Sequence, residues 1–218
     1  MTPDYEKAAI AAAETLIRYC VTSAPVSPLP ILKQLPGVLV KSFEQLSSDI
    51  GQDRRCVLNT FGRCQDACTT VSMFNGKPHY LVTYNQQLSA VLVQRALARE
   101  LGHIILGHDG SRPEDVRMEE ARCFANHLLS PRPLIHAIQA SGLRLTTEML
   151  GNLTGCFEYC LSCMRRIPAV HVPAALNRAV RDQFMPYILN FFEYQRNVCP
   201  TDVSALADFG TFMDGYEE

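Results

Sequence analysis

The stretch ALARELGHIILGH, residues 96–108, decides how this chain is expected to fold. Its apolar side chains recur every three or four residues, and the same spacing runs through the preceding segment SAVLVQR. Because an α-helix turns once in ~3.6 residues, this spacing gathers the apolar side chains on one face. The pattern therefore predicts a long amphipathic helix that ends at Asp109-Gly110-Ser111.

Polar residues inside this helix match part of the zinc-peptidase motif H-E-x-x-H, position by position. In that motif two histidines one turn apart bind zinc, and the intervening glutamate activates the metal-bound water. Glu100 and His103 occupy the glutamate and second-histidine positions, but Arg99 occupies the first. An arginine keeps its proton and has no lone pair for a metal, so the motif predicts impaired hydrolysis. The simpler alternative is an amphipathic core helix in which these polar residues are incidental.

A second helix is expected from about Glu114, because MEEARCFANHLL leads into the helix-stopping pair Ser130-Pro131. It carries two adjacent acids, Glu119 and Glu120, and zinc peptidases commonly take a third ligand from a following helix. The interval between His103 and these acids leaves room for a loop and an antiparallel return. The two helices are therefore expected to face one another.

Together, ALARELGHIILGH and MEEARCFANHLLSP resemble the ImmA/IrrE family of metallo-endopeptidases, whose pattern is HELGHxxLGH, a short loop and E-x-EAxxFAxxLLMP. The resemblance extends upstream through PHYLVTYNQQLSAVLVQR and downstream through TTEMLGNLTGCFEYCLSCMRR, and so covers about residues 1–170. It implies an α+β fold with a zincin-like core, a small antiparallel sheet plus helices. It also implies a zinc peptidase of stress or mobile-element regulation that cleaves a helix-turn-helix repressor.

The resemblance also implies a role for each motif position. His103 would be the second zinc ligand, Glu120 the third ligand and Glu100 the general base, while Arg99 fills the first ligand position. We expect the Arg99 guanidinium to project toward Glu120, with Glu100 as a second possible partner, and to hold the two helices together without a metal.

Another side chain could replace the missing zinc ligand. Cys123 stands one turn after Glu120 on the same helix face, so it is a possible substitute ligand. His127 lies about two turns from Glu120, too far to share one ion. His108 is five residues after His103 and is expected to point roughly 140° away from it.

Two main functions follow from these residues. The first expectation is a regulatory binding or sensing module that keeps the peptidase skeleton, is impaired as a protease and acts on a repressor-type partner. The alternative is an active zinc endopeptidase in which Cys123 completes the metal site. A DNA-binding regulator is a lesser alternative.

The rest of the chain predicts the elements around these helices. Runs rich in β-branched and aromatic residues predict strands, and Asn75-Gly76 predicts a hairpin whose loop Lys77-Pro78 could lengthen. A long helix near the C-terminus is expected to kink at Pro186. The expected strands are residues 38–43, 54–60, 66–74 and 78–85. The chain is expected to comprise a peptidase-type domain at 1–140, a helical extension at 141–200 and an acidic, loosely structured tail at 201–218.

Composition limits the class of protein. The chain has 218 residues and a formal net charge of −2, which argues against broad electrostatic binding to nucleic acid. Acidic residues near the N-terminus disfavour a secretory signal, and no apolar run approaches the ~20 residues of a spanning helix. We therefore expect a cytoplasmic protein without a membrane partner, in which the nine cysteines are free thiols.

Two further patterns in the C-terminal half favour packing over chemistry. Cys156, Cys160 and Cys163 have the spacing of an iron–sulfur motif, but this spacing also describes one stripe of an amphipathic helix. The segment TTEMLGNLTGCFEYCLSCMRR could form a helix-turn-helix, yet its second half has only Arg165 and Arg166 to contact DNA. DNA binding is therefore the less favoured reading of this segment.

Overall fold

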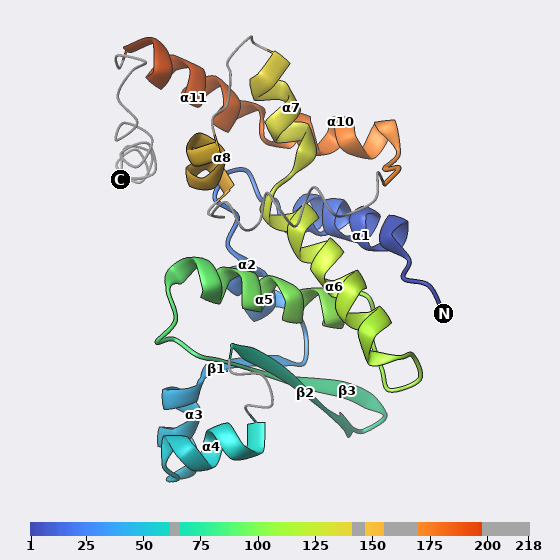
Figure 1. The fold of residues 1–218 in the computed structure, drawn as a ribbon, viewed down its shortest axis with the longest axis vertical. Helices are drawn as coiled ribbons and strands as arrows, with labels where there is room; N and C mark the ends of the chain where they lie inside the picture. The colour runs from blue at the N-terminus through green and yellow to red at the C-terminus, as the bar shows by residue number, and fades with distance from the viewer. Residues whose placement is uncertain (62–65, 141–146, 155–169, 198–218) are drawn as a thin grey trace. The chain divides into compact units, whose positions relative to one another are not determined.

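The computed structural model describes residues 1–61, 66–140, 147–154 and 170–197, and its fold class is the expected α+β (Figure 1). The chain divides into two compact units, which are treated separately. The sheet unit comprises Met1–Ala8 and Ser27–Ala125, and the helical unit comprises Ala9–Val26 and Asn126–Glu218. The domain boundary expected at residue 140 stays a prediction. No helix in the described ranges has the length and apolar character needed to cross a membrane.

The sheet unit is built on a sheet with strand order β1-β3-β2. β2 and β3 form the predicted antiparallel hairpin, in which Asn75 and Gly76 both have positive φ and Phe74 pairs with Lys77. Lys77-Pro78 therefore does not lengthen the loop. β1 runs parallel to β3, so the expectation of a purely antiparallel sheet is wrong. The strands are β1 (Val38–Ser42), β2 (Ala67–Phe74) and β3 (Lys77–Tyr84).

The strand expected at residues 54–60 is also wrong, because this segment forms the helix α4 (Arg54–Phe61). The Asp53 carboxylate accepts a hydrogen bond from the backbone N–H of Cys56 at 2.7 Å, and such a cap favours a helix start. Val57 is fully buried against Phe43 of the preceding helix. Capping and helix packing therefore outweigh the β-branched composition of this short run.

The amphipathic helix expected near residue 96 is α5 (Ala90–Ile105). Figure 1 shows α5 along one side of the sheet and α3 and α4 on the other side. α5 contacts β2 and β3, and its buried face includes Leu97 and Leu101. The other helices of this unit are α2 (Pro28–Gln34), α3 (Phe43–Ile50) and α6 (Glu114–Leu129), the last of which belongs to the sheet unit as far as Ala125.

Helices α5 and α6 pack closely at Gly102. A Cβ atom built there would lie 3.0 Å from Cδ1 and 3.2 Å from Cβ of Phe124, a side chain that is fully buried. We expect Gly102→Ala to lower the free energy of unfolding by about 1–3 kcal/mol, because the packed helices must move apart. Urea denaturation measures this loss. The matched control is Gly110→Ala, where no atom lies within 4 Å of the added Cβ, and an equal loss in both variants would contradict the close approach.

The helical unit contains the remaining helices. The long helix expected to kink at Pro186 is interrupted at Phe184, so that Pro186 falls in the first turn of a new helix, where its missing N–H costs little. Gln183 donates hydrogen bonds to the carbonyl oxygens of Leu16 at 2.8 Å and Val21 at 2.7 Å. These helices are α1 (Tyr5–Arg18, in this unit from Ala9), α7 (Arg132–Ala140), α8 (Thr147–Thr154), α10 (Ala174–Gln183) and α11 (Met185–Asn197).

Several sequence predictions concern other parts of the chain. The cysteine motif at 156–163, the second half of the possible helix-turn-helix and the acidic tail at 201–218 lie outside the described residues.

Candidate functional site

Glu100, the expected general base, is buried in the sheet unit. Its side chain on α5 is held by Thr69 of β2, whose hydroxyl donates a hydrogen bond to Oε2 at 2.8 Å. The residue is 6% exposed, and burial raises the pKa of its carboxyl although the Thr69 hydrogen bond and the Arg99 charge act in the opposite direction. Glu100 is thus a desolvated carboxyl tied to an edge strand.

Glu120, the expected third ligand, lies on α6 and accepts three hydrogen bonds. The backbone N–H of Asp4 donates to Oε1 at 2.7 Å, and Oε2 accepts from His108 Nε2 at 2.9 Å and from Arg112 Nη1 at 2.7 Å. Burial by itself raises the pKa of Glu120, but these three donors outweigh it and hold the pKa below its usual range. Glu120 is therefore a buried carboxylate, 2% exposed, whose negative charge the protein itself compensates.

His108 takes part in this site, contrary to the expectation that it points away from His103. α5 ends at Ile105, and Gly107 follows with φ of 66°, a left-handed conformation that reverses the chain. The His108 ring therefore returns to His103, with 2.8 Å between the two Nδ1 atoms. The prediction was wrong because it assumed that the helix continues through residue 108.

The hydrogen-bond pattern fixes the protons of the two histidines. His108 Nε2 faces a carboxylate, so it carries a proton and donates. Burial, together with nearby cations, lowers the pKa of His103 to about 4 and also lowers the pKa of His108, so both rings are neutral at pH 7. His103 Nδ1 then donates to His108 Nδ1, which leaves His103 Nε2 with a free lone pair.

Arg112, in the loop between α5 and α6, takes the place that the sequence suggested for Arg99. Arg112 forms the ion pair with Glu120, whereas the described partners of Glu120 do not include Arg99. Arg99 has a buried Nε atom without a hydrogen-bond partner. Its charge lowers the pKa values of its neighbours Glu100 and His103. Among the described residues, the arginine in the first ligand position therefore forms no ion pair within 4.0 Å, and it acts on Glu100 and His103 through its charge.

The facing atoms of the two histidines do not share a zinc ion in this arrangement. Ligand nitrogens bound at ~2.0–2.1 Å in a tetrahedral site stand about 3.3 Å apart, but Nδ1 of His103 and Nδ1 of His108 are separated by 2.8 Å, a hydrogen-bond distance. Cys123, the possible substitute ligand, is buried and donates to the carbonyl oxygen of Tyr5 at 3.5 Å. In the part of the chain that the structure describes, no three His, Cys, Asp or Glu residues are grouped to hold a metal.

Among the described residues, an open sheet edge lies beside Glu100. β2 is an edge strand, and the same strand carries Thr69, the hydrogen-bond donor to Glu100. Three large apolar side chains near its end are exposed: Val71 by 54%, Met73 by 67% and Phe74 by 64%. An edge of this kind can pair with an extended segment of another chain. Sequence reasoning missed this surface, although the spacing of Val71 and Met73 places both on one face of the strand.

Comparison with known proteins does not identify a relative. No family description matches the chain, and neither the curated proteins nor the solved structures contain a match. The likeness to the ImmA/IrrE metallo-endopeptidases therefore rests on the motif residues alone.

Proposed function

We propose that this protein is a cytoplasmic, metallopeptidase-like binding module of ImmA/IrrE type that recognises a repressor-type protein and is impaired as a zinc hydrolase. The observation that carries the proposal is the full engagement of Glu120 by Asp4, His108 and Arg112. In a zincin-like core this carboxylate would bind the metal. Here the Arg112 guanidinium compensates its charge instead, and the neutral His108 imidazole donates a hydrogen bond to it.

The charges around His103 also oppose a divalent ion. Arg99 and Arg117 both lower the pKa of His103, so two permanent cations act on the remaining candidate zinc ligand. A metal ion would have to displace Arg112 from Glu120 and overcome this repulsion. These costs support a protein whose helix pair is stable without zinc.

Zinc affinity tests the proposal. We expect weak zinc binding by the natural protein, and at least a 100-fold gain in the double variant Arg99→His, Arg112→Met, which restores a ligand and frees Glu120. The matched control is Arg99→His with Arg122→Met, because Arg122 forms its ion pair with Glu119 at the surface. Competition with a chromogenic chelator measures the affinity.

One result of this titration would favour the alternative function. Stoichiometric zinc in the natural protein, lost on His103→Ala and on Cys123→Ser, would contradict the proposal and indicate an active peptidase with a substitute ligand.

The open edge of β2 supports a protein partner, because an extended segment can add to it as a further strand. With a helix-turn-helix repressor as the probe and zinc present, we expect capture without cleavage. Met73→Lys should weaken capture at least tenfold, since Met73 is exposed on this strand. The control is Leu189→Lys, an exposed apolar residue of the helical unit. Prompt cleavage of the repressor would overturn the proposed function.

A further inference from the structure

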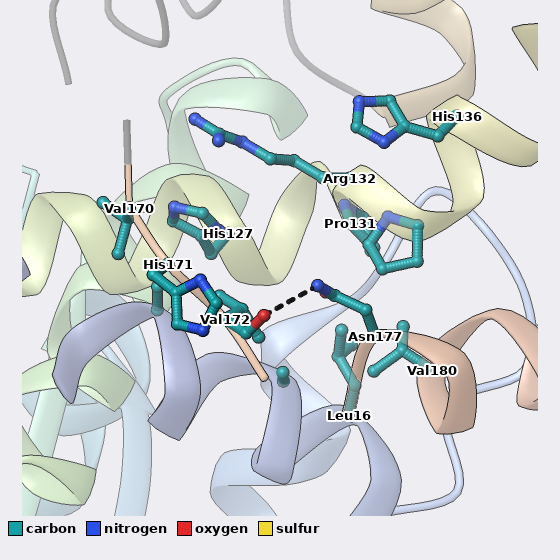
Figure 2. A pocket seen from close by; sticks show the side chains of 13 residues that line it. Leu16, His127, Pro131, Arg132, His136, Val170, His171, Val172, Asn177 and Val180 are labelled. Carbon is teal, nitrogen blue, oxygen red and sulfur yellow. Dashed lines mark hydrogen bonds between the residues drawn. The ribbon is translucent and has the colours of Figure 1, made fainter. Parts of the chain in front are cut away.

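A cavity of about 340 Å³ lies within the helical unit (Figure 2). Its described walls come from α1, from the segment joining α6 to α7, from residues 170–172 and from α10. This volume is at the lower end of the range of small-molecule sites in proteins. The cavity shares no residue with the site around Glu120.

One side of the cavity carries basic and imidazole groups. Figure 2 shows the Arg132 side chain extending above the His127 ring, with His171 below them and His136 farther along α7. The described lining includes no aspartate or glutamate, and Arg132 forms no ion pair with any described residue. α7 begins at Arg132, so the positive end of this helix dipole lies at the same wall.

The pKa of the His127 imidazole is lowered in this cavity. Burial, followed by the charge of Arg132, lowers its pKa to about 4. His127 is therefore neutral at pH 7 and can donate one hydrogen bond, and Arg132 supplies the permanent charge.

The opposite wall is apolar. Leu16 of α1 and Val180 of α10 are both 1% exposed, and alanines of α1 complete this wall. Asn177 uses one of its amide N–H groups within the protein, because Nδ2 donates to the carbonyl oxygen of Val172 at 3.1 Å, the dashed line in Figure 2. This bond fixes residues 170–172 at the rim of the cavity.

From this division we infer that the cavity binds a small amphiphilic carboxylate, with the anionic end at Arg132 and His127 and the hydrocarbon end against Leu16 and Val180. A guanidinium matches a carboxylate in geometry and charge. A free phosphate fits less well, because the described lining has a single permanent cation and is mostly apolar. The histidines do not suggest a metal, since no described group of three such residues is arranged to hold one.

Calorimetric titration of the full chain with hexanoate tests the inference, with inorganic phosphate and 1-hexanol as the comparison probes. We expect hexanoate to bind at least tenfold more tightly than either comparison probe. Arg132→Met should raise the hexanoate dissociation constant at least tenfold, since it removes the cation and keeps an apolar stem. The matched control Arg178→Met changes an exposed arginine of α10 that does not line the cavity, and should leave binding unchanged.

A second variant tests the cavity independently of charge. Ala13 lines the cavity, so Ala13→Leu should fill part of it and abolish hexanoate binding while circular dichroism shows an intact fold. If hexanol bound as tightly as hexanoate, Arg132 would not contribute to binding and the inference of an anionic ligand would be contradicted. If phosphate bound more tightly than hexanoate, the inference of an amphiphilic ligand would be contradicted. Absence of hexanoate binding, or binding that survives both variants, would overturn the inference. None of these outcomes depends on zinc or on the repressor, so this site and the proposed function are tested separately.

Discussion

Replacing Arg112 with methionine is expected to lower the free energy of unfolding by about 2–4 kcal/mol. Arg112 is the guanidinium bonded to Glu120 at 2.7 Å, and the carboxylate it compensates is 2% exposed. The variant leaves this buried charge with His108 and the Asp4 N–H as its remaining hydrogen-bond donors. The expected loss is below that of a fully enclosed pair, because the Arg112 side chain is 27% exposed and water can replace part of the interaction.

The comparison with Arg99→Met separates the two arginines. Arg99 has a buried Nε without a hydrogen-bond partner, so its removal should change stability by less than about 1 kcal/mol. Urea denaturation of both variants at neutral pH gives the two differences. A larger loss for Arg99→Met than for Arg112→Met would mean that Arg99 holds the helices together, as the sequence alone suggested.

The features that the sequence predicted well are local in origin. The spacing of apolar residues in ALARELGHIILGH is enough to predict α5, because the period belongs to a single helix. Asn75-Gly76 predicts the hairpin for a similar reason, since both residues readily take positive φ in a two-residue turn. The stop at Ser130-Pro131 also depends on adjacent residues alone.

The features that the sequence did not predict depend on where loops and connections bring distant residues back together. The parallel register of β1 follows from the connection through α3, α4 and β2, which no short pattern encodes. In the candidate site, the position of His108 depends on the reversal at Gly107, and the position of Arg112 depends on the loop before α6. Gly107 was an available signal, because a glycine just after a helix often adopts the left-handed conformation that turns the chain back.

Acidification from about pH 7 to about pH 4.5 is expected to lower the free energy of unfolding by about 2–4 kcal/mol through two half-buried histidines. Burial, followed by the interaction with His108 and then by Arg117 and Arg99, lowers the pKa of His103 to about 4 in the folded protein. Burial, followed by the charge of Arg132, lowers the pKa of His127 to about 4 as well. In the unfolded chain both rings titrate near the ordinary pKa of about 6.5. The unfolded state therefore binds more protons between these values, and stability falls as the pH drops from 6.5 toward 4.

Each histidine should contribute about 1–2 kcal/mol to this loss, less than the full shift implies, because both rings retain some exposure. The two belong to different units, so their contributions should add. Urea denaturation of His103→Gln and His127→Gln across this range should show a shallower pH dependence for each variant than for the natural protein. His136→Gln changes an exposed ring and serves as the control. If all three variants kept the natural slope, acid sensitivity would have to come from the carboxylates, since neither half-buried imidazole would then resist protonation in the folded state.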